Sequence, residues 1–157
     1  MWGVRKTILM IVAVVMGQSA LAADKKPLMD DPIVERTVHK QLKKPTGELT
    51  KADLEKVKRL FLSGNQLTDV KGLEKLTKLM ELRLDYNKLT SVKGLEKLNQ
   101  LTSLNLLGNK LTNVKGLENL TQLTYLHLRD NPDLTKAQID ELQKALPGCQ
   151  IRHNATK

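Results

Sequence analysis

The chain has 157 residues, a formal net charge of +9 and only 3% aromatic residues. Its single cysteine, Cys149, excludes an internal disulfide. The basic charge favours anionic partners through long-range attraction. Nucleic acid is nevertheless not an expected partner, because proteins that bind single strands line a basic groove with aromatic side chains, and this chain has too few of them.

The first 22 residues have the pattern of a secretory signal peptide. A basic pair at residues 5–6 precedes an apolar run over residues 8–16. This run is too short to cross a bilayer, which takes about 20 residues, and the small side chain of Ala22 suits cleavage after that position. We therefore expect an exported protein, periplasmic or secreted. Its signal peptide would be 1–22 and its flexible mature N-terminus 23–29, with no stable membrane anchor in the mature form.

Residues 30–56 carry two helix-start signals and are expected to form a helical N-terminal cap. Asp31 and Pro32 combine an N-capping side chain with a proline suited to the first helical turn. Thr50 and Asp53 match a capping box, which predicts a second, shorter helix through Leu54 and Val57. Apolar residues recur every four positions after Pro32, so the first helix has one buried face. They are Val34, Val38 and Leu42.

Residues 57–134 repeat one phrase of leucines at a constant period of 22 residues. The full phrase is L-x-x-L-x-L-x-x-N-x-L, and it begins at Leu79 and again at Leu101. Related copies begin at Val57 and Leu123. Four copies in register are the leucine-rich repeat pattern, so we predict that these residues form a solenoid.

Within each phrase the leucines alternate as in a short strand with one buried face, for example at Leu82 and Leu84. The chain then turns inside the solenoid, where an unpaired backbone group costs about 1 to 3 kcal/mol. An asparagine side chain can pair with the backbone of its own turn and of the next one. We interpret the closing asparagines as a structural ladder and not as ligands. They are Asn65, Asn87, Asn109 and Asn131.

Each repeat returns through a second limb, such as Val70-Lys71-Gly72-Leu73-Glu74. Its glycine suits a bend, since glycine adopts positive φ without steric cost. Limbs this short predict irregular or single-turn helical structure on the convex side. The lysines that recur there, each followed by a glutamate, are interpreted as a solvated and partly compensated face. They are Lys71, Lys93 and Lys115.

Residues 135–157 are expected to form the C-terminal cap and tail. Thr135 and Gln138 form another capping-box pattern. The helix that follows should end at residues 147–148, which are proline and glycine, and residues 149–151 should add an edge strand. The predicted fold is an α/β solenoid: a leucine-rich repeat arc with a short-stranded parallel sheet on its concave face and helical caps at both ends.

The residue patterns of this chain do not predict catalysis. Cys149 and His153 could pair only near the end of the chain, without an acid partner or an oxyanion arrangement, and Cys149 is interpreted as a small buried hydrophobe. His39 and His127 have no metal-ligand spacing to other residues. Phosphate loops, nucleophile elbows and paired carboxylates are also missing from the sequence. We therefore predict a protein without catalytic residues, metal or cofactor.

The solvent-facing positions of the predicted sheet form columns across the repeats. Their residues differ from one repeat to the next, although the buried positions are nearly identical. Residues that are free of the packing constraint can serve recognition, and solenoids usually bind there. Aromatic and arginine side chains are common anchors of protein interfaces. The predicted binding residues are Arg59, Phe61, Glu81, Arg83, Asp85, Tyr86, Leu107, Tyr125, His127 and Arg129.

The chain resembles bacterial leucine-rich repeat proteins of the short, 22-residue class and is similar in pattern to the internalins. The likeness rests on the phrase that begins at Leu79, on the linking Val-Lys-Gly-Leu-Glu segments and on the helical N-terminal cap. In that family the concave face binds a protein. The residues to which the resemblance carries this role are Phe61, Arg83, Tyr125 and His127. Host-cell adhesion is not part of this expectation, because the chain has few repeats and we see neither a following immunoglobulin-like domain nor a wall-anchoring tail.

Three functional hypotheses follow from the sequence. The leading one is an exported, non-catalytic module that binds a protein or peptide through the concave sheet. The alternative is a binder of envelope polysaccharide or another anionic polymer through the basic convex surface. The third is an accessory subunit of a larger exported assembly, and the oligomeric state is left open.

Overall fold

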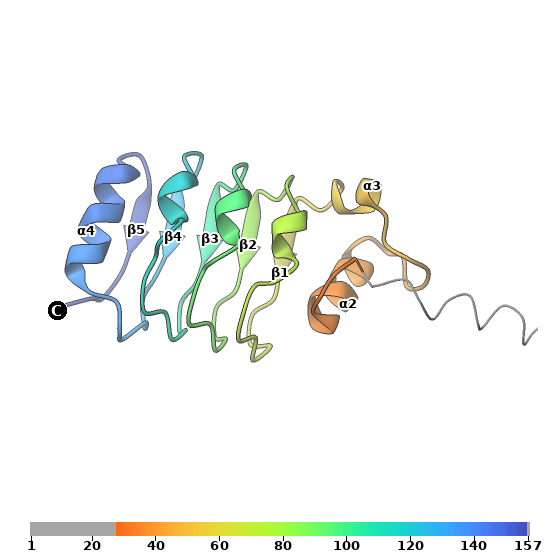
Figure 1. Ribbon diagram of the computed structural model, residues 1–157, viewed down its shortest axis with the longest axis horizontal. Coiled ribbons are helices and arrows are strands. Elements are labelled where there is room, and N and C mark those ends of the chain that lie inside the picture. The colour runs from red at the N-terminus through yellow and green to blue at the C-terminus, as the bar shows by residue number, and fades with distance from the viewer. Residues whose placement is uncertain (1–27, 157) are drawn as a thin grey trace, which may run out of the picture.

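The computed structural model describes residues 28–156, and the predicted signal peptide lies outside these residues. The chain forms a solenoid in which short strands stack side by side, with 3-10 turns and a helix on the opposite side and two helices at the N-terminal end (Figure 1). The strands are parallel and follow the order β1-β2-β3-β4-β5. The predicted α/β solenoid with helical caps is confirmed.

Each strand is three residues long and presents its middle residue to the core. The middle residues pair with one another across the sheet: Leu60 with Leu82, then Leu104, Leu126 and Ile151. The first four are fully buried, whereas the flanking residues of each strand face solvent in part or fully. The strands are β1 (Arg59–Phe61), β2 (Glu81–Arg83), β3 (Ser103–Asn105), β4 (Tyr125–His127) and β5 (Gln150–Arg152).

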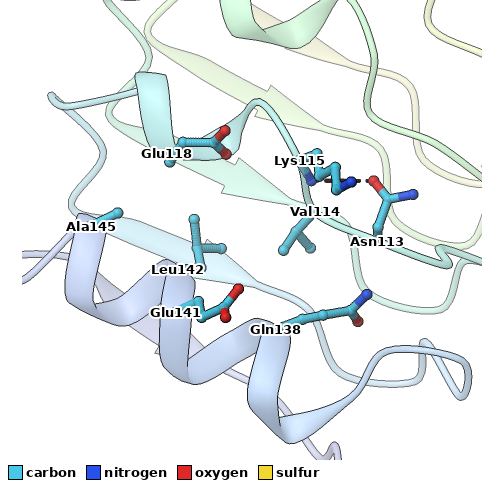
Figure 2. A pocket seen from close by; sticks show the side chains of 8 residues that line it. All are labelled: Asn113, Val114, Lys115, Glu118, Gln138, Glu141, Leu142 and Ala145. Atoms are coloured by element: carbon cyan, nitrogen blue, oxygen red, sulfur yellow. Dashed lines mark hydrogen bonds between the residues drawn. The ribbon is translucent and has the colours of Figure 1, made fainter.

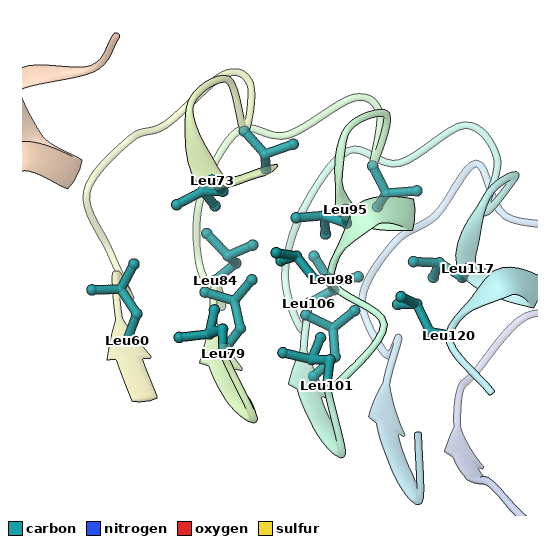
Figure 3. Packing of buried hydrophobic residues seen from close by; sticks show 14 of the residues in the cluster. Leu60, Leu73, Leu79, Leu84, Leu95, Leu98, Leu101, Leu106, Leu117 and Leu120 are labelled. Atoms are coloured by element: carbon teal, nitrogen blue, oxygen red, sulfur yellow. The ribbon is translucent and has the colours of Figure 1, made fainter. Parts of the chain in front are cut away.

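One hydrophobic core runs through all the repeats (Figure 3). Leucines of the strands, such as Leu60, meet leucines of the convex limbs, such as Leu73, Leu95 and Leu117, and all are fully buried. Burying one leucine side chain stabilises the fold by about 1.5 to 3 kcal/mol. Because a stack of this kind exposes apolar side chains at its ends, it needs caps.

The convex side consists of single 3-10 turns, as the short limbs predict. Each turn follows a glycine with positive φ: Gly72 at 87°, Gly94 at 107° and Gly116 at 97°. The glutamate two residues later accepts a hydrogen bond from that glycine N–H, for example Glu74 from Gly72 at 2.7 Å. These glutamates therefore stabilise the backbone bend. Lys71 forms its ion pair with Asp69 and not with Glu74. The turns are η1 (Leu73–Lys75), η2 (Leu95–Lys97) and η3 (Leu117–Asn119).

The N-terminal cap consists of helices α2 (Pro32–Gln41) and α3 (Lys51–Leu54). Asp31 caps α2 by accepting hydrogen bonds from the N–H groups of Ile33 and Val34. Val34 and Val38 are buried in the core, so this helix closes the end of the stack beside β1 (Figure 1). The predicted second helix includes Val57, but α3 ends at Leu54 because the chain then extends into β1.

The C-terminal cap consists of helix α4 (Lys136–Ala145) followed by β5. Thr135 and Gln138 form the predicted capping box. Gln143 donates hydrogen bonds to the carbonyls of Leu146 and Cys149, both at 3.0 Å, which fixes the turn between α4 and β5. In residues 28–156, the helices are all too short or too polar to cross a membrane.

Candidate functional site

The solvent-facing columns continue across β5, one strand further than the repeats. Gln150 lies beside Tyr125, and Arg152 lies beside His127. Sequence reasoning missed Arg152, and the predicted edge strand at 149–151 is the signal that could have found it. The two columns are Arg59-Glu81-Ser103-Tyr125-Gln150 and Phe61-Arg83-Asn105-His127-Arg152.

A third column follows directly after the strands. Backbone pairing continues there, since the Gly64 N–H donates to the Asp85 carbonyl and the Tyr86 N–H donates to the Leu107 carbonyl. In this column Asp85 accepts hydrogen bonds from the Ser63 hydroxyl at 2.8 Å and the Asn105 amide at 3.1 Å. The third column is Ser63, Asp85, Leu107 and Arg129.

Three of the four asparagines form a hydrogen-bonded ladder beneath this face. The side-chain oxygen of Asn87 accepts from the Leu67 N–H at 3.0 Å, and its amide donates to the carbonyls of Leu62 and Leu84. Asn109 and Asn131 make the same contacts one and two repeats later. This ladder fixes the turns that follow neighbouring strands and so holds the columns at constant spacing.

Asn65 departs from this arrangement. It is partly exposed, and its amide donates to the Ser63 carbonyl of its own turn at 3.1 Å. The difference has a simple reason: Asn65 belongs to the first repeat, and the chain before it is the helical cap, which has no equivalent turn to pair with.

The N-terminal half of the concave face carries one exposed aromatic ring and a compensated charge cluster. Phe61 is 50% exposed, and the guanidinium carbon of Arg83 lies 4.9 Å from its ring centroid. Arg83 also pairs with Glu81 at 3.0 Å, and Arg59 pairs with the same carboxylate at 3.6 Å. Because both arginines form ion pairs with Glu81, the surface that this half presents to a partner is mainly the apolar ring of Phe61.

Tyr86 lies at the rim of the face in a backbone conformation that is unusual for an aromatic residue. Its φ is +55°, and the equivalent positions in other repeats are Gly64, Gly108 and Asp130. The ring is 62% exposed and rests on Gly108, where an added Cβ would come within 2.8 Å of the Tyr86 ring. Left-handed backbone costs a non-glycine residue about 1 to 3 kcal/mol and is concentrated at functional sites. Tyr86 therefore has a strained backbone and an exposed ring that packs against Gly108.

The C-terminal half of the face brings together two rings and two arginines. The ring centroids of Tyr125 and His127 are 6.2 Å apart in an edge-to-face arrangement. The guanidinium carbon of Arg152 lies 5.6 Å from the Tyr125 ring centroid. Burial lowers the pKa of His127, and the charges of Arg129 and Arg152 lower it further. The structure thus places Arg152 with the predicted residues Tyr125, His127 and Arg129.

Comparison with known proteins agrees with this geometry. The family model for leucine-rich repeats (two copies) matches residues 55–97. Internalin C2 from Listeria monocytogenes matches with a TM-score of 0.71 and 26% identity over 86% of this chain and 62% of its own. The functional domain of InlJ from the same organism matches with a TM-score of 0.67 and 28% identity over 80% of this chain and 28% of its own. The chain is an internalin-like leucine-rich repeat protein.

A leucine-rich repeat protein of Leptospira interrogans is also similar to the chain, with a TM-score of 0.58 and 32% identity over 66% of this chain and 27% of its own. The internalin-like chain therefore spans less than two thirds of the length of each of these structures. No curated protein sequence matches it significantly. The repeats and the internalin neighbours support a protein-interaction module, a class of scaffold that is typically non-catalytic.

Cys149 of this internalin-like protein is buried and carries a free thiol. Burial raises its pKa, so the protonated thiol is favoured over the nucleophilic thiolate. Across the part of the chain that the structure describes, histidine, cysteine, aspartate and glutamate side chains do not gather into a metal-binding cluster of three or more. Cys149 therefore has the properties of a packing residue in the C-terminal cap.

A groove of about 420 Å³ lies on the other side of the internalin-like solenoid, between the limb of the last repeat and α4 (Figure 2). Val114 and Leu142 contribute its apolar surface. Lys115 carries a positive charge there, whereas Glu118 and Glu141 carry negative ones. Such a mixed lining selects neither an anion nor a cation, so the concave face is the stronger candidate for a binding site.

Proposed function

We propose that this protein is a non-catalytic module that binds a protein or peptide through its concave sheet. The observation that carries the proposal is the exposure of large apolar rings on that face. Only three large hydrophobic side chains of residues 28–156 are exposed, and Phe61 and Tyr86 belong to this face. Since exposed apolar and aromatic groups are the usual anchors of protein interfaces, these two rings favour a protein partner.

The size of the face supports a small epitope. Neighbouring strands lie about 4.8 Å apart, so Phe61 on β1 and Tyr125 on β4 are separated by roughly 14 Å. The ladder beneath the sheet holds these positions rigid, which reduces the entropy that binding must overcome. An extended peptide or a single protruding loop fits a surface of this size.

We also propose that the protein acts outside the cytoplasm, in the periplasm or as a secreted protein. The pattern of residues 1–22 supports this location. N-terminal sequencing of the protein recovered from each cell fraction tests it. A mature chain beginning near Ala23 in the periplasm or medium is expected, and an intact N-terminus confined to the cytoplasm would contradict it.

The test of the binding face is affinity capture from envelope and secreted fractions with Phe61→Ala/Tyr86→Ala. Each anchor residue contributes about 2 kcal/mol or more at a protein interface, so the double variant should lose the captured partner. Met80→Ala is the matched control, because Met80 is 46% exposed but precedes β2 and lies outside the concave columns. Equal capture by the wild type and the double variant would exclude the proposed face.

A second candidate function is the binding of an anionic envelope polymer through the convex lysines. It is favoured by one observation: Glu96 and Glu118 accept hydrogen bonds from glycine N–H groups, and Lys93 and Lys115 form no ion pair within the described chain. Binding to such a polymer should fall steeply with added salt. Lys93→Glu/Lys115→Glu should abolish it, whereas Phe61→Ala/Tyr86→Ala should leave it intact.

A further inference from the structure

The arginines in the two halves of the concave face differ in whether they form ion pairs. In the N-terminal half, Arg59 and Arg83 share the carboxylate of Glu81. In the C-terminal half, Arg129 and Arg152 are both exposed, and neither has a carboxylate within ion-pair distance among residues 28–156. Two guanidinium groups are thus available at one end of the face.

Asp130 and Asp85, the two carboxylates that act on the charge of His127 beside these arginines, form hydrogen bonds with other side chains. Asp130 accepts a hydrogen bond from the Asn154 amide at 2.9 Å, and its own N–H donates to the Asn154 side-chain oxygen at 3.0 Å. Asp85 accepts hydrogen bonds from Ser63 and Asn105. These contacts hold both carboxylates at the rim of the face, where they do not form ion pairs with Arg129 or Arg152.

His127 lies beside Arg152 across the sheet and two residues before Arg129, which follows the end of β4. Its Nε2 atom is buried and has no hydrogen-bond partner in the described part of the chain. The groups that act on its charge are Arg129, Arg152, Asp130 and Asp85. The two arginines disfavour the imidazolium and the two aspartates favour it, and with burial the balance disfavours it.

We propose that Arg129, Arg152 and Tyr125 form a carboxylate-binding subsite for an acidic segment of the protein partner. Guanidinium groups bind carboxylates through paired hydrogen bonds. Arg152 is already placed for this role, since it stacks on the Tyr125 ring, which reduces the freedom that it would lose on binding. This inference rests on the proposed function and adds the chemistry of the ligand.

An acidic peptide fits this face better than an extended anionic polymer. A polymer lying across the sheet would meet arginines that Glu81 already binds and the carboxylate of Asp85, where like charges oppose it. A peptide can place an acidic side chain at the arginines of the C-terminal half and apolar side chains over Phe61 and Tyr86. The face is therefore complementary to a segment that is acidic at one end and apolar at the other.

The subsite also links binding to protonation of His127. A bound carboxylate adds a negative charge beside the imidazole and raises its pKa from the lowered value in the free protein. Binding then takes up protons, so affinity increases as the pH falls through the pKa of His127 in the complex. Glutamate side chains of the ligand remain ionised until the pH approaches about 4.3.

The test is a titration of the isotopically labelled chain with N-acetylated triglutamate, followed by the NMR signals of the arginine Nε–H groups and the His127 ring. Saturable shifts are expected at Arg129, Arg152 and His127, together with an increase in the pKa of His127. The variant Arg129→Gln/Arg152→Gln should raise the Kd at least tenfold. Arg59→Gln is the matched control and should change the Kd less than twofold, because Arg59 is already held by Glu81.

Two outcomes would overturn the subsite. One is an equal affinity for triglutamate in the wild type and in Arg129→Gln/Arg152→Gln. The other is a set of shifts on Lys93 and Lys115, with inorganic polyphosphate binding more tightly than triglutamate, since this assigns the anion affinity to the convex surface. Exposed arginines are not needed for folding, and an unchanged thermal unfolding curve for each variant checks this.

The same experiment separates this inference from the proposed function. Triglutamate has no apolar side chain, so Phe61→Ala/Tyr86→Ala should bind it normally while losing the protein partner. If triglutamate does not bind the wild type but capture still depends on Phe61 and Tyr86, the subsite is wrong and the binding face stands. If triglutamate binds at the arginines but capture is independent of the rings, the subsite stands and the assignment of Phe61 and Tyr86 as partner anchors is wrong.

Discussion

Each buried asparagine of the ladder pairs backbone groups that an apolar residue would leave unpaired. Asn109 accepts from the Leu89 N–H and donates to the carbonyls of Leu84 and Leu106. Asn109→Ala leaves the Leu89 N–H without a partner, whereas the two carbonyls each keep one donor, Asn87 for Leu84 and Asn131 for Leu106. We therefore expect the free energy of unfolding in urea to fall by about 1 to 3 kcal/mol. Asn65→Ala is the matched control and should cost less than about 1 kcal/mol. Equal losses would show that the ladder does not hold the turns.

The left-handed backbone of Tyr86 gives a second prediction for a single residue. Glycine occupies the equivalent position in two other repeats, at Gly64 and Gly108, because it adopts this conformation without steric cost. Tyr86→Gly should therefore raise the free energy of unfolding by about 1 kcal/mol, measured by urea denaturation. The same variant should bind the partner more weakly. Gly108→Ala should destabilise the protein instead, because the new Cβ meets the Tyr86 ring. A stability loss in Tyr86→Gly would mean that the ring contributes to folding more than the strain opposes it.

Which residues face the concave side could be predicted, because the leucine phrase sets an alternation that side chains must follow. What those residues contact could not, since ion pairs and ring contacts depend on side-chain geometry. The pairing of Arg59 and Arg83 with Glu81 and the seating of Tyr86 on Gly108 are of this kind. The positive φ of Tyr86 could have been predicted from the sequence, because the equivalent positions hold Gly64, Gly108 and Asp130, and glycine and aspartate tolerate this conformation.

At the scale of the element, the short helix α3 depends on one carboxylate. Asp53 accepts hydrogen bonds from Lys44, from the Thr50 N–H and from the Thr50 hydroxyl, and these hold its pKa well below the usual value of 3.8. Because the pKa is lower in the folded state, Asp53 stabilises the fold above pH 3.8 and this contribution is lost as the pH falls further. Asp53→Asn should lower the urea midpoint at neutral pH, and the difference from the wild type should shrink below pH 3.8.

Asp69→Asn is the control for this pH profile. Asp69 forms an exposed pair with Lys71 at 3.6 Å, and exposed pairs contribute about 0 to 1 kcal/mol. A difference for Asp53→Asn that persists unchanged at about pH 2 would contradict the role of the ionised carboxylate. It would assign the effect to the shape of the side chain.

The caps show which elements the sequence encodes locally and which it does not. Thr135 with Gln138 and Thr50 with Asp53 could be recognised because a capping box involves residues only three positions apart. The register of β5 required the assembled sheet, since this strand has no leucine phrase of its own and Ile151 continues the leucine row only by pairing with Leu126. That is why Arg152 was missed.

At the scale of the whole molecule, the constant register makes one repeat removable. Deleting residues 79–100 joins Lys78 to Leu101, which takes the place of Leu79 at the start of the same phrase. The oxygen of Asn109 then meets the N–H of Leu67, as that of Asn87 does in the intact protein. Because the core and the ladder continue across the junction, the shortened protein should fold and unfold in one transition, at a lower free energy of unfolding.

This deletion also separates the two recognition elements of the concave face. It removes Tyr86 and brings Phe61 one strand spacing, about 4.8 Å, closer to the C-terminal half, so partner capture should be lost. Arg129, which follows β4, and Arg152 on β5 both remain, so triglutamate should bind with the affinity of the intact protein once Arg59, which loses Glu81 in the deletion, is also changed to Gln. Urea denaturation and the triglutamate titration together measure both outcomes. Loss of cooperative unfolding would show that the repeats are not equivalent, and loss of triglutamate binding would show that the second repeat supports the subsite.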